Sequence, residues 1–369
     1  MRLSLLLGVF VCLAVAVSPA QRRKKDEEDI TQTLEALQDP PMTVAAETSR
    51  LVFDVSPLSS KGLLSQQTRD ALRTLMRRSK RARFVKLRAL VAGSGDMRRV
   101  RDIVSEVFTD RRQPLPALSV VQVGGLPMEG AQVVIESVAI SRREQNPHGL
   151  AWFSGQQVAG ENPLDPALPL ARKAVANLAT AVGGSGVQAS DVLTVTCFLS
   201  SLAGVNDIRT MVRKEFPSAV ANHVQVQRAP SQAVAECEAV ARNQAKPANP
   251  IVFLNPEGLP KSPNYSQVAV VDAPRVVLSG TQMAFRFQES DARLAFERLA
   301  KALEEGNASP KDVVFASAYP LSPSIAELIR KVRFEFFDKS RPPASTMLPF
   351  EGLPSMDASF AIDVVAVPK

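Results

Sequence analysis

Three octapeptides of one pattern recur along the chain: TRDALRTL at 68–75, ARKAVANL at 171–178 and ARLAFERL at 292–299. Each begins with a small residue and an arginine, has alanine at its fourth position and ends on leucine. Apolar residues three and four positions apart lie on one face of an α-helix. The three stretches therefore predict three equivalent amphipathic helices, and with them an internal repeat of roughly 115 residues.

The segments on either side of each helix also recur in one order. A strand precedes the helix, and a β-branched strand, a second amphipathic helix closing on phenylalanine, an extended segment, a turn and a final strand follow it. Each final strand contains an acidic residue among mostly apolar neighbours: Glu136, Glu238 and Asp363. Polar, proline-containing linkers lie at 142–147 and 244–250. We expect three related units, at 46–142, 146–243 and 250–369.

Composition excludes several classes of protein. The chain has 369 residues, of which 45% are hydrophobic and 22% charged, so wholesale disorder is excluded. With three cysteines and two histidines it has no disulfide framework, and a zinc site would need most of these side chains. Nucleotide-binding glycine patterns, zinc-protease motifs and nucleophile elbows are missing from the sequence.

The N-terminus has the pattern of an export signal. Residues 3–17 form an apolar run after Arg2, and Ser18-Pro19-Ala20 provides a small-residue cleavage site. We interpret 1–20 as a cleaved signal peptide and 21–45 as a flexible lead-in, with an uncleaved membrane anchor as the alternative. The mature protein is then exported, periplasmic or secreted, and without a membrane span.

Export would place two cysteines in an oxidising compartment. Cys197 and Cys237 both lie in apolar, strand-like runs. Two buried free thiols are the interpretation that this context favours, with a disulfide as the alternative.

Positive charge is concentrated in one stretch. Residues 73–112 contain 13 Lys and Arg against four acids, whereas the whole chain has a formal net charge of +7. Such a stretch can bind an anionic surface or polyanion, although a solvated helical face is the simpler interpretation. Aromatic residues for base stacking are confined to Phe84 and Phe108, so the stretch gives little support for RNA binding.

An ordered set of short motifs in the third unit resembles the RidA/YjgF family, formerly called endoribonuclease L-PSP. The motifs are SPNYSQ at 262–267, VLSG at 277–280, SPKDVV at 309–314, GLP at 352–354 and IDVVAV at 362–367. The resemblance covers essentially all of 250–369, is weaker over 146–243, where Phe153-Ser154-Gly155-Gln156 matches a strand end, and is weakest over 46–142.

The resemblance implies a chorismate-mutase-like α+β fold in which two helices back a β-sheet. Family members form homotrimers with ligand clefts between subunits, and they hydrolyse reactive enamines and imines without a metal or cofactor. Three tandem copies would make the chain a monomer with internal pseudo-threefold symmetry, an intramolecular pseudo-trimer with three inequivalent clefts.

The resemblance also shows that one functional residue is missing. The family grips its ligand's carboxylate with an arginine, for which a planar guanidinium is well suited. The corresponding positions here are Leu118, Ala221 and Ser345. Arg341 lies four residues out of register and is the candidate substitute, although a solvated loop charge is the simpler interpretation.

Other family positions are retained. Tyr265 and Ser279 match the site tyrosine and serine, and Glu236 matches the carboxylate that orders the attacking water. Gly280, Ser154 and Gly155 match strand-end positions that a ligand approaches. Glu236 is either a buried acid or a solvent-facing residue, and Tyr265 could equally pack at an interface. His148 and His223 are interpreted as packing or surface residues, and no metal site is expected.

The sequence therefore predicts an exported RidA-like protein that binds a small imino- or keto-acid-like metabolite in clefts between units. Residual enamine/imine deaminase activity, with Tyr265, Ser279 and Glu236 as catalytic residues and no cofactor, is one outcome. The alternative is a non-catalytic interaction or scaffold module that uses its basic first unit to bind anionic partners.

Overall fold

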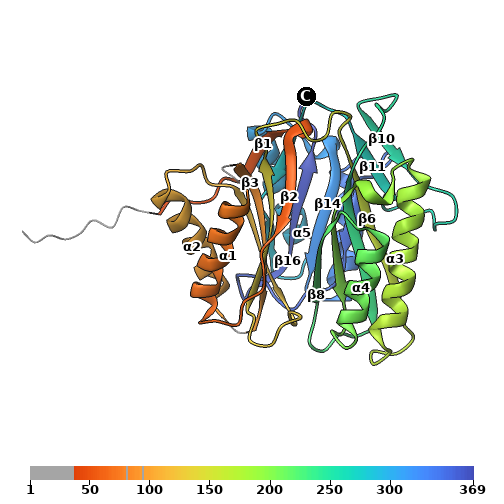
Figure 1. The fold of residues 1–369 in the computed structure, drawn as a ribbon. Helices are drawn as coiled ribbons and strands as arrows, with labels where there is room; N and C mark the ends of the chain where they lie inside the picture. Colours follow the sequence, from red (N-terminus) through yellow and green to blue (C-terminus); the bar gives the residue numbers. More distant parts are fainter. Residues whose placement is uncertain (1–36, 80–81, 94) are drawn as a thin grey trace, which may run out of the picture. The chain divides into compact units, whose positions relative to one another are not determined.

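A computed structural model describes residues 37–79, 82–93 and 95–369, and these form three β-sheets and six α-helices (Figure 1). The fold is mixed α+β, as the sequence predicted. The predicted signal peptide (1–20) and most of the predicted lead-in lie outside the described residues.

The first sheet has the order β2-β5-β3-β4. Its strands are β2 (Leu51–Val55), β5 (Val133–Ile140), β3 (Arg83–Ala92) and β4 (Ala117–Val123). Helices α1 (Leu64–Arg78) and α2 (Met97–Asp110) share a hydrophobic core with it, which contains Leu72, Leu75, Ile103 and Phe108. The octapeptide at 68–75 therefore lies in α1 and buries the predicted face.

The second sheet has the order β10-β11-β6-β9-β7-β8. Its strands are β10 (Ile251–Leu254), β11 (Val268–Val271), β6 (Leu150–Ala159), β9 (Val234–Arg242), β7 (Val192–Leu199) and β8 (Val220–Gln225). Helices α3 (Ala167–Gly184) and α4 (Val205–Glu215) pack on its core face, and Figure 1 shows them side by side. The second octapeptide, at 171–178, lies within α3, and its first residue, Ala171, is fully buried.

The third sheet has the order β1-β12-β16-β14-β15, with β13 also paired to β16. Its strands are β1 (Thr43–Glu47), β12 (Arg275–Ser279), β16 (Ala358–Ala366), β14 (Val313–Pro320), β15 (Ala344–Met347) and β13 (Gln282–Phe285). Helices α5 (Glu289–Glu305) and α6 (Pro323–Val332) bury their apolar faces against it. A 3-10 turn, Arg333–Glu335, continues α6.

Three strands join a sheet other than the one expected from the repeat. Strands β10 and β11, inside the predicted third unit, pair antiparallel with each other and with β6 of the second sheet. Strand β1, which includes the last residues of the predicted flexible lead-in, pairs with β12 of the third sheet. The end of the lead-in is ordered because backbone pairing with β12 satisfies its amide and carbonyl groups.

Cys197 and Cys237 form a disulfide, with an S–S distance of 2.04 Å. They are buried, as expected, but the expectation of free thiols is wrong. Cys197 of β7 lies directly opposite Cys237 of β9 in the antiparallel ladder, so the pairing register brings the two side chains together. Sequence spacing alone does not reveal that register.

The three sheets meet in a shared hydrophobic cluster. Val85 comes from the first sheet, Leu150 and Trp152 from the second, and Val276 and Phe315 from the third. The charged and polar groups beside this cluster form one of the two sites described next.

Candidate functional site

One small cleft lies between the second and third sheets and has a volume of about 70 Å³. It is lined by residues of β6, β9, the loop before β11, α6 with its 3-10 turn, and β15: Gly155, Gln157, Glu236, Asn264, Tyr265, Arg330, Arg333, Ser345 and Met347. Three residues predicted for the site, Glu236, Tyr265 and Gly155, are therefore brought together.

Glu236 is buried in this cleft, which decides between the two interpretations left open above. Its pKa is raised to about 8, chiefly because burial penalises the carboxylate and then because Glu238 lies near it. Gly155 makes room for it, since a Cβ there would lie 1.8 Å from Oε1 of Glu236. The register of β6 against β9 is irregular between Phe153 and Gln156, as in a β-bulge. With a pKa of about 8, Glu236 is protonated at neutral pH.

Tyr265 is half-buried, and its pKa is raised by burial and by the nearby Glu236. Its loop is held by Ser154, whose Oγ donates to the carbonyl of Ser266 at 2.6 Å and accepts from the amide of Ser345 at 2.8 Å. Ser154 was predicted to bind ligand. Its Oγ is instead used within the protein: the bond to Ser266 holds the loop before β11, and the bond from Ser345 of β15 joins the second sheet to the third.

Two arginines missed by sequence reasoning also line the cleft. Arg333 is only 3% exposed, and its Nε and Nη2 atoms have no hydrogen-bond partner among the described residues. Its guanidinium carbon lies 5.4 Å and 5.5 Å from the ring centroids of Phe334 and Phe337. Burial, and then Arg330, lower its pKa to about 10, so the side chain remains charged at neutral pH. The run of basic residues at 330–333 was the available sequence signal.

Ser279 and Gly280 lie elsewhere. The Oγ of Ser279, which is fully buried, accepts from the amide of Val364 at 2.9 Å. Gly280 lines a larger cleft of about 410 Å³ between the third and first sheets, where an added Cβ would lie 2.8 Å from the carbonyl oxygen of Leu118. Gly280 therefore lines a different cleft from Glu236 and Tyr265, and Ser279 lines neither cleft.

Arg341 is exposed and its Nε donates to Asp338 at 3.1 Å. It lines none of the cavities described in this section. Its predicted role as the substitute arginine therefore has no support from its position.

A second cavity, of about 190 Å³, adjoins the Glu236 cleft and shares Gln157, Arg330 and Met347 with it. The rest of its lining is mostly uncharged, and includes Gln227 and Gln232. A ligand bound in the small cleft would thus have polar space beside it.

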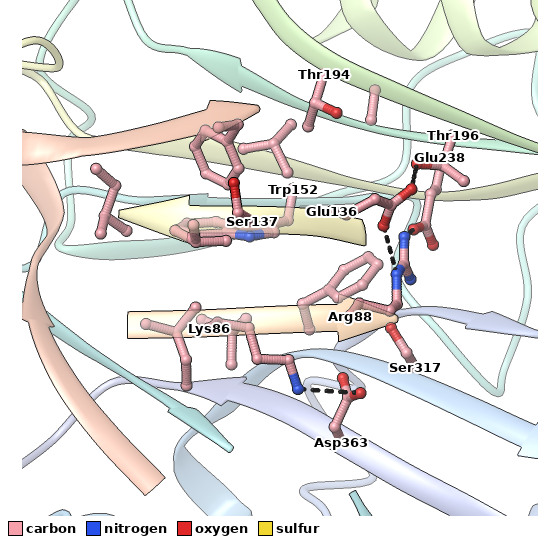
Figure 2. A pocket seen from close by; sticks show the side chains of 18 of the residues that line it. Lys86, Arg88, Glu136, Ser137, Trp152, Thr194, Thr196, Glu238, Ser317 and Asp363 are labelled. Carbon is pink, nitrogen blue, oxygen red and sulfur yellow. Dashed lines mark hydrogen bonds and ion pairs between the residues drawn. The ribbon is translucent and has the colours of Figure 1, made fainter. Parts of the chain in front are cut away.

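A central cavity of about 120 Å³ lies where the three sheets meet (Figure 2). Arg88 of the first sheet donates from Nε to Glu136 and from Nη2 to Glu238 of the second sheet, both at 2.6 Å. The other oxygen of Glu136 accepts from Thr196 at 2.6 Å and from Asn222 at 2.7 Å. These bonds connect the first sheet to the second.

Lys86 connects the first sheet to the third in the same cavity. Its Nζ donates to Ser119 at 2.6 Å and to the carbonyl of Ser279, and lies 3.2 Å from Asp363 (Figure 2). Burial lowers its pKa, and the Asp363 carboxylate acts in the opposite direction. With three partners for three N–H groups, Lys86 is satisfied by the protein itself.

Much of the basic stretch is paired. Arg99 contacts Glu106 at 2.9 Å and Asp102 at 3.4 Å, Arg73 lies 3.3 Å from Asp70, and Arg98 lies 3.2 Å from Asp96. Lys86 and Arg88 face the central cavity, as described above. Because Lys86 and Arg88 are largely buried while Arg73 and Arg98 stay exposed, part of the positive charge of residues 73–112 is withheld from solvent.

Within the described ranges, no three His, Cys, Asp or Glu side chains are grouped as metal ligands would be. Over the same residues, every helix is too short or too polar to cross a bilayer. His148 is partly exposed, whereas His223 is buried and burial lowers its pKa to about 4.

Comparisons with known proteins relate one part of the chain to a family. Residues 259–368 match the family model described as Endoribonuclease L-PSP, which supports that family for this part of the chain. No curated protein matches the chain.

Among solved structures, a Rid-family protein of unknown function from Yersinia pestis has 19% identity and a TM-score of 0.30; the match covers 32% of this chain and 99% of that one. A member of the YjgF/YER057c/UK114 family from Mycobacterium tuberculosis has 20% identity and a TM-score of 0.24. That match covers 32% of this chain and 98% of the other.

Proposed function

We propose that this chain is an exported RidA-like protein that binds a small imino- or keto-acid-like metabolite in the Glu236 cleft and hydrolyses imines or enamines there. The observation that carries the proposal is a buried, protonated Glu236 in one small cleft with Tyr265 and two guanidinium groups. An acid whose pKa lies near neutrality is suited to general acid and base catalysis.

The chemistry needs only water besides the substrate. Glu236 can protonate the imine nitrogen and then, as the carboxylate, take a proton from the water that attacks the imine carbon. A C–O bond forms, the C–N bond breaks, and a ketone and ammonia leave. Tyr265, on the loop that precedes β11, lines the same cleft as Glu236 and can hydrogen-bond the substrate.

The assay uses 2-iminopropanoate generated in situ. We expect the full-length protein to accelerate its hydrolysis over buffer, and Glu236→Gln to lose at least about tenfold of that acceleration, since general acid–base catalysis contributes 10²–10⁴-fold. Arg341→Gln, outside the cleft, is the matched control. Hydrolysis by the wild type at the buffer rate would refute the enzymatic proposal.

The same proposal includes three tandem units arranged as an intramolecular pseudo-trimer. Support comes from the shared hydrophobic cluster and from the Arg88 and Lys86 ion pairs that cross between sheets. Light scattering of the purified protein should give the mass of one chain, and a stable assembly of three chains would contradict it. Export is tested by cell fractionation, which should recover the protein outside the cytoplasm.

A non-catalytic module that binds anionic partners through residues 73–112 is the alternative. It ranks second because two basic side chains of the stretch, Lys86 and Arg88, are used in buried ion pairs. Vesicles containing anionic lipid test it: binding that is lost in Arg77→Glu/Arg78→Glu, with no imine hydrolysis, would favour the alternative.

A further inference from the structure

Three side chains lie at the boundary between the Glu236 cleft and the adjoining cavity of about 190 Å³, because they line both. These are Gln157 of β6, Arg330 of α6 and Met347 of β15. A substrate whose imine carbon lies at Glu236 has the adjoining cavity as space for its side chain. The boundary residues therefore contact that side chain first.

Gln157 lies directly opposite Glu236 in the antiparallel pairing of β6 with β9. Directly opposite residues project from the same face of a sheet, with Cβ atoms about 4.5–5.5 Å apart. Gln157 is exposed, whereas Glu236 is buried. A ligand that enters from solvent can therefore reach the glutamine amide beside the acid.

The other two boundary residues offer less to an uncharged polar group. Arg330 pairs with Glu327, which lines the same cavity, so these two side chains add no net charge to its wall. Met347 presents a thioether, which is only a weak acceptor. Gln157 carries both a carbonyl oxygen and an NH₂ group, so it can donate to and accept from a hydroxyl or an amide.

Two further glutamines line the adjoining cavity. Gln227 donates from Nε2 to the carbonyl of Phe350 at 3.0 Å, and Gln232 donates from Nε2 to the carbonyl of Gly160 at 2.8 Å. These bonds use the side-chain nitrogens, and each amide keeps its carbonyl oxygen as an acceptor. The cavity thus matches a short side chain with an uncharged donor, because its lining holds no unbalanced charge to pair with an ionised one.

We infer that Gln157 selects the substrate by its side chain, and favours imines whose side chain ends in an uncharged hydrogen-bonding group, a hydroxyl or an amide. The side chain enters the adjoining cavity, and Gln157 hydrogen-bonds its polar end. The inference rests on the proposed function in placing the imine carbon at Glu236. The competing explanation is a solvated glutamine that contacts no ligand.

Two imines that differ by one hydroxyl test the inference. An amino acid oxidase generates them in situ from 2-aminobutanoate and homoserine, and their hydrolysis by the full-length protein is measured. We expect kcat/KM to be about tenfold higher for the homoserine imine, the upper range for one uncharged hydrogen bond. Equal values of kcat/KM would overturn the inference.

The imines of asparagine and aspartate repeat the comparison for an amide against a carboxylate of the same shape. We expect the asparagine imine to have the higher kcat/KM. A preferred aspartate imine would overturn the restriction to uncharged groups.

Gln157→Leu removes the amide and keeps a side chain of similar size. It should lower kcat/KM for the homoserine imine about tenfold and leave that for the 2-aminobutanoate imine within about twofold. Gln157→Met repeats the test with an unbranched side chain. Gln66→Leu, the same change at an exposed residue of α1 that lines none of the cavities described above, should keep the preference. A preference that survives in both Gln157 variants would refute the role of Gln157.

Binding of stable keto acids separates this inference from the enzymatic proposal. Calorimetry compares 2-oxobutanoate with 4-hydroxy-2-oxobutanoate. If the wild type hydrolyses no imine but binds the hydroxylated keto acid about tenfold more tightly, and Gln157→Leu does not, the side-chain site stands and the enzymatic proposal falls. If the 2-aminobutanoate and homoserine imines are hydrolysed with equal kcat/KM, the enzymatic proposal stands and this inference falls. Equal affinities, or binding of neither keto acid, together with no hydrolysis, would overturn both.

Discussion

The central cavity and the Glu236 cleft both contain buried arginines, and the two arginines differ in their partners. In the central cavity Arg88 meets two carboxylates at 2.6 Å each. In the cleft, Arg333 has two N–H donors without an acceptor among the described residues. The comparison teaches that two buried arginines in one protein can differ in role: Arg88 is neutralised by carboxylates and holds the sheets together, whereas Arg333 is neutralised by no side chain among the described residues.

The central cavity also shows how the three sheets differ in the residues paired across their strands. Arg88 lies opposite Glu136 in the first sheet, Thr196 opposite Glu238 in the second, and Ser317 opposite Asp363 in the third. The acid is present in all three sheets, but the cations are only in the first. Lys86 and Arg88, both from the first sheet, thus pair with acids from all three sheets. These contacts form only when the three different sheets assemble, and would not form among three copies of the same sheet.

The largest expected effect comes from removing the paired arginine. Arg88→Met leaves Glu136 and Glu238 without their shared partner, and should lower the free energy of unfolding by about 3–5 kcal/mol. Urea denaturation measures the change. Adding Glu136→Gln and Glu238→Gln to Arg88→Met should restore part of the lost free energy of unfolding. A loss below about 1 kcal/mol in Arg88→Met alone would show that the pairing is not structural.

The second prediction concerns the protonated acid of the cleft. From about pH 4.5 to 8, folded Glu236 holds a proton that the unfolded chain has lost, so stability falls as pH rises. We expect the wild type to lose about 3 kcal/mol relative to Glu236→Gln between roughly pH 5 and 8. Parallel stability curves for the two proteins over that range would contradict the raised pKa.

His223 tests whether an unpartnered atom alone marks a ligand site. Its Nε2 is buried without a partner in the described structure, yet it lines none of the cavities considered above. Because burial lowers its pKa from 6.5 to about 4, stability falls as pH falls through this range.

We expect His223 to cost the folded state about 2 kcal/mol at roughly pH 5, an effect absent in His223→Gln. NMR titration of the imidazole provides the direct measurement. A titration midpoint near 6.5 would refute the prediction.

The smallest expected effect is that of Arg333→Met, in the Glu236 cleft, on the free energy of unfolding. Arg333→Met removes a buried charge that lacks a partner and keeps a flexible apolar stem, so the free energy of unfolding should stay the same or rise by about 1 kcal/mol without ligand. Thermal and urea unfolding measure it beside Arg88→Met. A loss of more than about 2 kcal/mol would mean that Arg333, like Arg88, is structural.

The repeated octapeptides and the segments around them predicted the order of the helices and strands, because helical and strand periodicities are local properties of the chain. The α+β class was implied by the family resemblance. Local pattern could not assign β1, β10 and β11 to their sheets, since an edge strand pairs with whichever backbone edge lies beside it. For the same reason the register that joins Cys197 to Cys237 was not predictable.

The sequence also identified Glu236, Tyr265 and Gly155, and it showed that the family arginine is missing. Whether Glu236 is buried, and whether Ser279 lies with it, depended on which sheets meet at each cleft. Arg333 was not predicted because a basic residue at a helix end normally faces solvent. Only the tertiary structure placed its guanidinium among the residues that line a buried cleft, with Nε and Nη2 unpartnered within the described part of the chain, since burial depends on which elements pack around the end of α6.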